Sequence, residues 1–450
     1  MRKIIAMLLT FFATVSVVSA ETITKTISSL GVNKSAIAVS IKEAKTGNEV
    51  FAMNQNTPML PASTLKLVTT YAALNTLGRD YNYSTSLYKS TNNDLYIKLG
   101  ADPFLSSSDL SKLFQTAKEK NIIAPKNVYI DSRIFDSVEW GEGWQWDDDL
   151  NPLMPKFSAY NLDGNLLKIE ITPTVNNTPA TIVTKPFYPL TFMNLVTTSL
   201  TDKNSVKLSR NANLAPNILT AEGVVSKTEF LKVPVNNTRR YFVLRTEEIL
   251  RDKKFDYFKP ITNVSLPVKN VYKVAEVTHS IEDALTEILQ NSNNMVAETT
   301  FKLAGSIWAK SQGNLNNSRD MLNSYLKNLG LNTDNIRIVD GSGVSKNNIM
   351  TSDFMTSFLV KIYSDSNFEE FEAYMPSPGE GTLKNRMLYF KDNLKAKTGT
   401  LSDTSAIAGY ITTRKGKTYT FDIMINDAKT SPADKKNIEE QILRNVYVNY

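Results

Sequence analysis

Apolar and polar residues alternate in two short segments near the start of the chain. The segments are IAVSIKEA at 37–44 and NEVFAM at 48–53, and Thr46-Gly47 stands between them. A period of two is typical of strands that bury one face, and glycine supplies the positive φ that tight hairpin turns need. The pattern therefore predicts a β-hairpin, with Lys45-Thr46-Gly47 on a solvated bend.

A helical period follows this hairpin. Leu65, Val68, Ala72 and Leu77 recur at helical spacing after Pro61, and Gly78 closes the run. Similar patterns predict helices at 281–305, 317–330 and 434–448, whereas the segments 395–401, 405–413 and 418–426 are strand-like, with a hairpin turn at 414–417. In the last helix Ile438, Ile442, Leu443 and Val446 fall on one face, which we interpret as core packing.

The middle of the chain has a different pattern of hydrophobic and polar residues. From about 88 to 267 we expect short strands and turns, with one helix at 109–120. The clearest expected strands are NDLYIKLGADPFL (93–105), NVYIDSRIF (127–135), NLLKIEITPTV (165–175) and RRYFVLRTEEIL (239–250). We therefore predict a β-rich insertion of one or two small domains at 88–267, between flanking parts of one α+β domain at 21–87 and 268–450.

The N-terminus has the features of a signal peptide. Arg2 and Lys3 precede an apolar run, and Val18-Ser19-Ala20 forms a small-residue cleavage site before Glu21. The short run favours a signal peptide at 1–20 over an uncleaved anchor. We expect an exported, periplasmic protein with at most peripheral association with membranes.

Composition narrows the possible chemistry. The 450 residues include no cysteine, which excludes disulfides, a thiol nucleophile and cysteine-bound zinc. The net charge of +6 is mild and no basic cluster stands out, so we expect no nucleic-acid partner. His279 is the sole histidine, and no nucleophile-elbow motif accompanies it. We predict a structural histidine, with no metal and no cofactor.

Ser63-Thr-Leu-Lys66 is the first candidate for catalysis. Residues at i and i+3 share a helix face, and the N-terminus of a helix favours negative charge on Ser63. A lysine with a lowered pKa could act as the base for such a serine. The spacing also arises by chance in a chain of this length, so the motif alone does not establish catalysis.

Two further motifs could contribute to catalysis or binding beside Ser63 and Lys66. Ser292-Asn293-Asn294 separates two helical runs, where small polar residues are usually caps, but Ser292 could relay a proton and Asn294 could bind an amide. The second Lys-Thr-Gly, at 397–399, lies in a strand-like segment that continues into Thr400. Gly399 would let a ligand backbone lie close to that strand. The first copy of the tripeptide bends a hairpin, and the second lines a potential binding edge.

The order Ser-x-x-Lys, Ser-x-Asn, Lys-Thr-Gly resembles the active-site-serine, penicillin-recognising family. From Ser63 to Ser292 is 292 − 63 = 229 residues, and from Ser292 to Lys397 is 397 − 292 = 105. The long first gap is similar to that of the D-alanyl-D-alanine carboxypeptidase/endopeptidase group, the class C low-molecular-mass penicillin-binding proteins. Further similar stretches are LGADPFLSSSDL (99–110), IDSRIFD (130–136), GWQWDDDL (143–150), DGSGVSKNN (340–348) and GTLKNR (381–386).

This resemblance implies an α+β transpeptidase/β-lactamase-like domain, with an antiparallel sheet flanked by helices and interrupted by the insertion. It implies that Ser63 is acylated, Lys66 is its base and Ser292 shuttles the proton. It also implies that Asn294 orients the peptide and that Lys397 and Thr398 hold the terminal carboxylate and keep Lys66 less basic. Backbone N–H groups of Ser63 and Thr400 would form an oxyanion hole. The partners implied are peptidoglycan peptides, with β-lactam antibiotics as covalent inhibitors.

Substrate choice rests on weaker features. Asp148, beside Trp144 and Trp146, could meet the amine of a diaminopimelate side chain, and Arg386 could pair with a second carboxylate. Each could equally be an ordinary surface charge. Two alternative functions remain: a β-lactamase, although Glu298 is no convincing deacylating base, and a non-catalytic penicillin-binding sensor of the cell wall.

Overall fold

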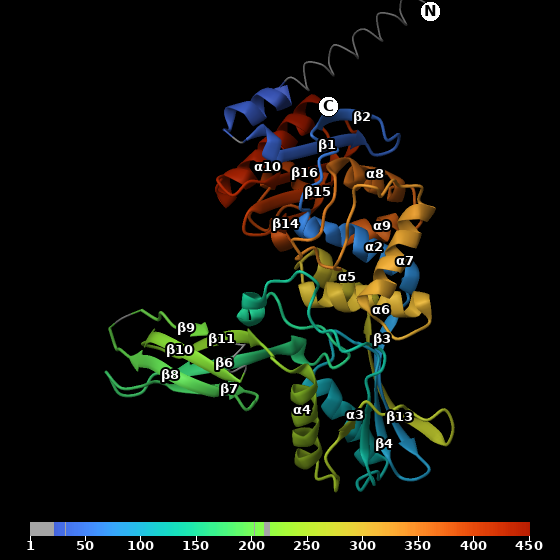
Figure 1. Cartoon of the computed structure of the whole chain (residues 1–450), viewed down its shortest axis with the longest axis vertical. Helices are drawn as coiled ribbons and strands as arrows, with labels where there is room; N and C mark the ends of the chain where they lie inside the picture. The colour runs from blue at the N-terminus through green and yellow to red at the C-terminus, as the bar shows by residue number, and fades with distance from the viewer. Residues whose placement is uncertain (1–21, 32, 202, 211–216) are drawn as a thin grey trace, which may run out of the picture.

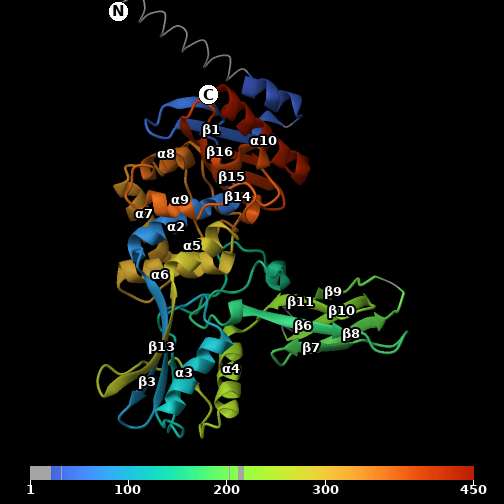
Figure 2. The same cartoon turned by 180° about the vertical axis from the view of Figure 1, so that it is seen from behind.

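The computed structural model describes residues 22–31, 33–201, 203–210 and 217–450. The expected signal peptide at 1–20 lies outside these ranges. Figures 1 and 2 show an elongated molecule whose chain forms three parts. We call them the head (residues 22–78 and 281–450), the stalk below it (residues 79–165 and 235–280), and the arm (residues 166–234), which projects sideways. No helix among the described residues is long and apolar enough to cross a membrane.

The head is built on one antiparallel sheet, in the order β14-β15-β16-β1-β2. Its strands are β1 (Ile37–Glu43), β2 (Glu49–Met53), β14 (Leu394–Thr400), β15 (Thr404–Thr412) and β16 (Thr418–Asn426). The turn between β1 and β2 contains Gly47 at φ 74°, and Gly416 at φ 75° lies in the turn between β15 and β16. Both predicted hairpins are confirmed.

Helices cover both faces of this sheet. On one face, α10 (Pro432–Asn449) buries Ile438, Ile442, Leu443 and Val446 against strand residues such as Ile407, which confirms the core-packing interpretation. The other face is covered by α8 (Ser352–Ile362), whose Leu359 carbonyl accepts a hydrogen bond from Tyr410 Oη. The other helical elements of the head are η2 (Ala62–Leu65), α2 (Lys66–Leu77), α5 (Ile281–Leu289), α6 (Asn294–Ala309), α7 (Leu315–Asn328) and α9 (Phe368–Ala373), of which α5 and α6 lie next to the stalk in Figure 1.

The stalk is a second sheet in the order β12-β5-β4-β3-β13. Its strands are β3 (Asn82–Ser90), β4 (Leu95–Leu99), β5 (Val128–Asp131), β12 (Ile261–Thr262) and β13 (Val271–Ser280), with helices α3 (Ser107–Glu119) and α4 (Thr238–Asp252) beside it. Because β3 pairs with β13 from Asn82–Ser280 to Ser90–Val271, a division at 88 and 267 would cut β3 and separate its partner. We propose boundaries near 80 and 280 instead.

The arm consists of two three-stranded sheets, β11-β6-β7 and β8-β10-β9. Their strands are β6 (Leu166–Thr172), β7 (Thr181–Lys185), β8 (Thr191–Thr198), β9 (Lys207–Ser209), β10 (Ile218–Val225) and β11 (Glu229–Pro234). The strands that we expected within 93–105, 127–135 and 165–175 are confirmed as β4, β5 and β6.

The expected strand at 239–250 is wrong, because this segment forms helix α4. Tyr241, Phe242 and Val243 have high strand propensity when taken alone. Yet Tyr241, Phe242, Ile249 and Leu250 are all buried, at a spacing that matches a helix. Asn237 caps the helix by accepting a hydrogen bond from the Arg240 backbone N–H at 2.8 Å. Tertiary burial and this cap override the local propensity.

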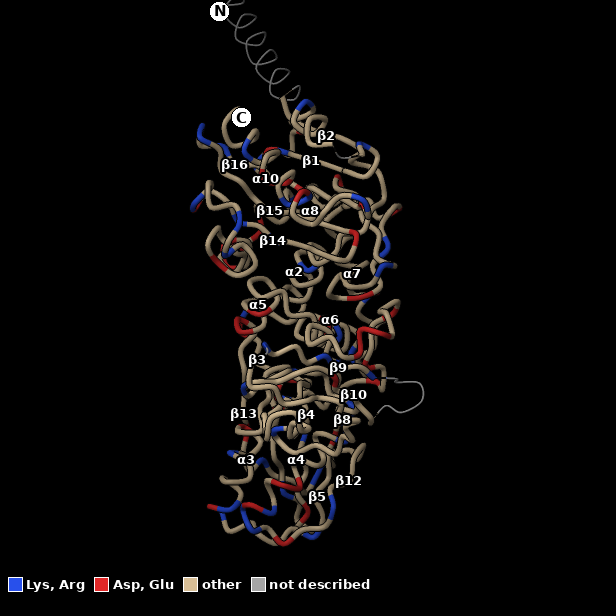
Figure 3. The backbone as a smooth tube through the Cα atoms, turned by 90° about the vertical axis from the view of Figure 1, so that its left-hand side faces the viewer, with Lys and Arg blue, Asp and Glu red and all other residues tan. Residues whose placement is uncertain are grey.

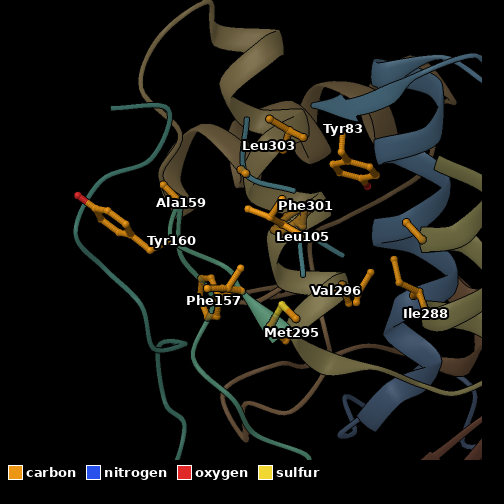
Figure 4. Close-up of a cluster of buried hydrophobic side chains, with 14 of the residues drawn as sticks. Tyr83, Leu105, Phe157, Ala159, Tyr160, Ile288, Met295, Val296, Phe301 and Leu303 are labelled. Carbon is orange, nitrogen blue, oxygen red and sulfur yellow. The ribbon is translucent and has the colours of Figure 1, made fainter. Parts of the chain in front are cut away.

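A continuous apolar cluster joins the head to the insertion. Figure 4 shows Met295, Val296, Phe301 and Leu303 beside Phe157, with Tyr160 on the segment that leaves the cluster. Lys and Arg alternate with Asp and Glu along the length of the molecule, as Figure 3 shows. The two long strands β3 and β13, together with this cluster, hold the insertion beneath the helix that begins at Asn294.

Candidate active site

Ser63 lies in η2, one turn before α2 begins at Lys66. The preceding residue, Ala62, has φ 48°, an uncommon conformation for a residue with a side chain. Its carbonyl oxygen would lie only 2.0 Å from a Cβ at Gly343, so glycine is required there. Such strain is typical of functional sites, and here it fixes the entry of the chain into the helix that carries Ser63.

Lys66 is fully buried and lies at the centre of the site. Its Nζ is 2.9 Å from Ser63 Oγ, 2.7 Å from Asn294 Oδ1 and 2.7 Å from the carbonyl oxygen of Ser342. A neutral amine has two N–H groups and one lone pair. Because Asn294 Oδ1 and the carbonyl can only accept, they take the two N–H groups, and the lone pair is left for the hydroxyl of Ser63.

Burial lowers the pKa of Lys66 to about 7, although the carboxylates of Asp340 and Glu298 oppose the shift. The resemblance implied that Lys397 keeps Lys66 less basic, whereas burial is the largest cause of the shift in the structure. Burial, and then the charge of Lys66, lowers the pKa of Lys397 well below its usual range. A bound carboxylate would restore the charge on Lys397.

The second lysine is linked to the Ser-x-Asn segment. Lys397 Nζ donates to Ser292 Oγ at 2.9 Å and to the carbonyl oxygen of Thr398 at 3.1 Å. Ser292 has φ 57°, in the left-handed region. The amide of Asn294 is also fixed, because its Nδ2 donates to the Leu153 carbonyl oxygen at 2.8 Å. The structure thus brings together Ser63, Lys66, Ser292, Asn294 and Lys397.

Gly399 permits the close approach of β14 to the serine. A Cβ at this position would lie 2.8 Å from the backbone nitrogen of Ser63 and 2.9 Å from the Pro61 carbonyl oxygen. Thr398 is buried and Thr400 is exposed, at the end of the same strand. The strand edge predicted from the second Lys-Thr-Gly therefore runs beside Ser63.

Two buried acids, Glu298 and Asp340, lie beneath Lys66. The sequence analysis assigned these two residues no role in the site. Glu298 accepts hydrogen bonds from the backbone N–H groups of Gly341 (3.0 Å) and Ser342 (2.7 Å), which holds the Ser342 carbonyl under Lys66. Asp340 accepts from Gly343 N–H (2.8 Å) and from the Trp144 indole (2.9 Å). Burial, and then Asp340, raises the pKa of Glu298 to about 8. Asp340, Gly341 and Ser342 belong to the segment DGSGVSKNN (340–348), which is the sequence signal for these contacts.

A cleft of about 340 Å³ opens above Ser63. Asn294 and Thr400 line it, together with Asp148 on η3 (Trp146–Leu150). Lys346, from the same DGSGVSKNN segment, also lines it and was not predicted. The carboxylate of Asp148 and the ammonium of Lys346 give this cleft one charge of each sign.

Two other candidates lie elsewhere. Arg386 pairs with Glu439 at 2.5 Å, and this fully buried carboxylate also accepts from Ser405 Oγ at 2.6 Å. Because a buried carboxylate requires its counter-charge, Arg386 is held there and does not line the cleft, which corrects our expectation. His279 Nδ1 lies 2.7 Å from Asp102 Oδ2, in the stalk. In the part of the chain that the structure describes, no cluster of three His, Asp or Glu residues could hold a metal ion.

A serine beside a lysine of lowered pKa, bordered by Ser-x-Asn and Lys-Thr-Gly, defines the class of active-site-serine, penicillin-recognising enzymes. The fold agrees: penicillin-binding protein 4 (DacB) of Haemophilus influenzae superposes with a TM-score of 0.80 at 23% identity, over 92% of this chain and 96% of that one. This chain therefore has a transpeptidase/β-lactamase-like fold with extra domains.

The profile of the D-Ala-D-Ala carboxypeptidase 3 (S13) family matches residues 20–446, so the chain belongs to this family of serine peptidases. Similar curated proteins include a D-alanyl-D-alanine carboxypeptidase of Actinomadura sp., 25% identical over 88% of this chain and 78% of its own length. Another is the D-alanyl-D-alanine carboxypeptidase DacB of H. influenzae, 23% identical over 93% of this chain and 91% of its own length.

Proposed function

We propose that this enzyme removes the terminal D-alanine from peptidoglycan stem peptides, and also cleaves cross-links as a DD-endopeptidase, through an acyl-enzyme on Ser63. The observation that carries the proposal is the contact of buried Lys66 Nζ with Ser63 Oγ at 2.9 Å, beside two acceptors that would take the N–H groups of a neutral amine. Membership of the S13 family supports the reaction type.

Acylation would begin when neutral Lys66 accepts the proton of Ser63 Oγ and the oxygen attacks the carbonyl carbon of the scissile bond. The backbone N–H groups of Ser63 and Thr400 would stabilise the oxyanion, where one donor is worth about 3 to 4 kcal/mol in other enzymes. As the C–N bond breaks, Ser292, hydrogen-bonded to Lys397, would relay the proton taken up by Lys66 to the departing amine nitrogen of D-alanine. Water would then lose a proton to Lys66 as it attacks the ester carbonyl, and that proton would return to Ser63 Oγ as the ester breaks.

The remaining polar groups would position the substrate. Asn294 would orient the peptide, and Lys397 and Thr398 would bind the terminal carboxylate, which would recharge Lys397. Asp148 and Lys346 line the same cleft with opposite charges. This pair would suit a zwitterionic side chain such as that of diaminopimelate, with its amine at Asp148 and its carboxylate at Lys346.

The burial of Glu298 argues against the β-lactamase alternative. Its carboxylate is fully buried and accepts N–H groups from the Gly341–Ser342 loop, so it is not available to activate water in the cleft. We expect slow release of β-lactam acyl groups and therefore inhibition; one H. influenzae homologue has been solved with a β-lactam bound. A non-catalytic sensor would not need the Lys66 arrangement.

We also propose that the protein is exported to the periplasm after cleavage of residues 1–20, on the strength of the N-terminal sequence. At most peripheral association with membranes would follow.

Mass spectrometry of the intact protein after incubation with benzylpenicillin tests the nucleophile. We expect a stable adduct on the parent enzyme and complete loss of that adduct in Ser63→Ala. An adduct that persists in Ser63→Ala would move the nucleophile elsewhere. Rapid consumption of the antibiotic without an adduct would favour a β-lactamase, and neither adduct nor consumption would favour the sensor.

A further inference from the structure

Two adjoining cavities lie where the segment 132–160 meets the arm and the start of α4. The smaller, of about 280 Å³, is lined by Trp146 and Arg210, and the larger, of about 550 Å³, by Tyr160 and Arg239. Lys156 and Asn236 line both. We call the pair the arm groove. Trp146 begins the turn that carries Asp148, so the groove starts one turn of chain away from the substrate cleft.

Arg210 lines the smaller cavity, and two of its buried hydrogen-bond donors have no partner among the described residues. Its side chain is only 3% exposed, and its Nη1 donates to Asp149 Oδ2 at 3.0 Å. Nε and Nη2 have no hydrogen-bond partner among the described residues. These two N–H groups form one edge of the guanidinium and point in the same direction, which is the geometry that binds both oxygens of a carboxylate. A buried donor pair left unsatisfied is costly, and an anionic ligand would satisfy it.

The larger cavity has the same preference for anions. The 15-residue helix α4 begins beside it, and its first turn contains no acidic residue. It contains instead Arg239 and Arg240, which the positive end of a helix disfavours. Arg239 is exposed and makes no hydrogen bond or ion pair with a described residue, whereas Lys156 Nζ donates to the Asn236 carbonyl oxygen at 2.7 Å.

The acidic groups around the groove are already occupied. Asp136 pairs with buried Lys302 at 2.5 Å, and Glu139 accepts from Thr238 Oγ1 at 2.5 Å. Asp149 is held by Arg210. Lys156 also pairs with Glu139 at 3.9 Å, and the Tyr160 hydroxyl, which Figure 4 shows directed away from the apolar cluster, is hydrogen-bonded to Ser132 and Asn263. The cationic donors left without a partner among the described residues are therefore Nε and Nη2 of Arg210 and the guanidinium of Arg239.

Trp146 adds a flat apolar wall. Its side chain is 68% exposed and Trp140 lines the same cavity. An exposed indole packs well against a ligand that is apolar on one face and polar at its rim, such as a sugar ring. The ligand should therefore combine saccharide faces with carboxylates, and should continue from whatever occupies the cleft at Asp148.

We propose that the arm groove binds a carboxylate-bearing segment of the peptidoglycan strand, beyond the stem peptide held at Ser63. This inference rests on the proposed function, since it takes the peptide in the cleft to be a peptidoglycan stem. The groove would give the enzyme affinity for polymeric substrate without contributing to the chemistry at Ser63.

Arg239→Glu and Arg240→Glu provide a matched test, because both side chains are exposed in the same helical turn and only Arg239 lines the groove. Each variant is made in the Ser63→Ala background, and its affinity for soluble glycan fragments that carry stem peptides is measured by calorimetry. We expect Arg239→Glu to weaken binding about tenfold, as loss of a charge-assisted hydrogen bond would. Arg240→Glu should match the parent within about twofold.

The probes separate the possible ligands. Fragments whose carboxylates are amidated should bind as weakly to the parent as native fragments bind to Arg239→Glu. Equal weakening by both arginine variants, or no weakening by either, would overturn the proposal. Equally tight, Arg239-dependent binding of single-stranded DNA of similar charge would also overturn it, by showing a general polyanion site. Loss of affinity in Trp146→Ala gives a second, uncharged check.

A separate assay keeps the proposed function distinguishable. With Ser63 intact, Arg239→Glu should hydrolyse a short acylated D-Ala-D-Ala peptide at the parental rate. If the parent itself does not hydrolyse that peptide, the proposed function fails. If the parent and variant both hydrolyse it and bind glycan fragments equally, only the groove proposal fails.

Discussion

The head and the arm bury different kinds of residue. In the head, ionisable side chains lie deep inside: Lys66, Glu298, Lys397 and Glu439 are all completely buried. In the arm, by contrast, large apolar side chains are exposed, including Met193 at 56%, Leu195 at 57% and Phe230 at 52%. Burying a charge is costly unless partners compensate it. The head bears this cost where it performs chemistry, whereas the arm presents surface.

The two regions should therefore respond differently to substitution. Changes in the head should alter rates and pH dependence, because each buried charge is fixed by specific partners. Changes on the outer faces of the arm should alter little in the isolated protein. Five substitutions, in addition to Ser63→Ala, sharpen this contrast.

Lys66→Ala should have the largest effect of the five. Loss of the general base should slow acylation by benzylpenicillin at least about a hundredfold. In the parent, acylation should increase as pH rises through about 7, because Lys66 is protonated below its pKa of about 7 and only the neutral amine can accept the proton of Ser63. Stopped-flow acylation rates from pH 5 to 9 check both points. An unchanged pH profile in Lys66→Ala would assign the titration to another group.

Glu298→Gln should have the next largest effect. The amide would turn an N–H group toward the Gly341–Ser342 backbone, and leaving that buried donor unpaired should cost about 1–3 kcal/mol of unfolding free energy. Because burial raises the pKa of Glu298 to about 8, its carboxyl is largely uncharged at pH 7, and the inflection in the acylation profile should stay near pH 7. An unchanged midpoint in urea would contradict the structural role of Glu298, and a displaced inflection would show that its carboxylate is charged beside Lys66.

Asp148→Ala and Lys346→Ala should affect one class of substrate. Each removes one charge from the cleft wall, which we expect to lower kcat/KM for muropeptides containing diaminopimelate about tenfold. Acylation by benzylpenicillin should stay near the parental rate, since the antibiotic has no such side chain. Unchanged activity of Asp148→Ala on diaminopimelate muropeptides would remove this residue from substrate recognition.

Met193→Ser should have the smallest effect. The side chain lies on the exposed face of β8, so the unfolding free energy should change by no more than about 0.5 kcal/mol. Chemical denaturation followed by circular dichroism checks this. A markedly larger loss would break the comparison, by showing that this face of the arm is buried in the protein as it exists in solution.

The sequence determined most of the elements and marked the candidate reacting groups. Alternation predicted the hairpin around Gly47, helical spacing predicted α2 and α10, and the motif order marked Ser63, Ser292 and Lys397. These features are local, so residue spacing suffices to reveal them. The second Lys-Thr-Gly could be distinguished from the first because its neighbours were strand-like and apolar.

Only the tertiary structure decided what surrounds those groups. Burial lowered the pKa of Lys66, Glu298 and Ser342 came beneath it from segments far apart in the chain, and Glu439 drew Arg386 away from the cleft. Helix α4 formed where Tyr241 and Phe242 favoured a strand, because its apolar face found a core. Burial and long-range pairing depend on residues that are distant in sequence, and no local pattern contains them.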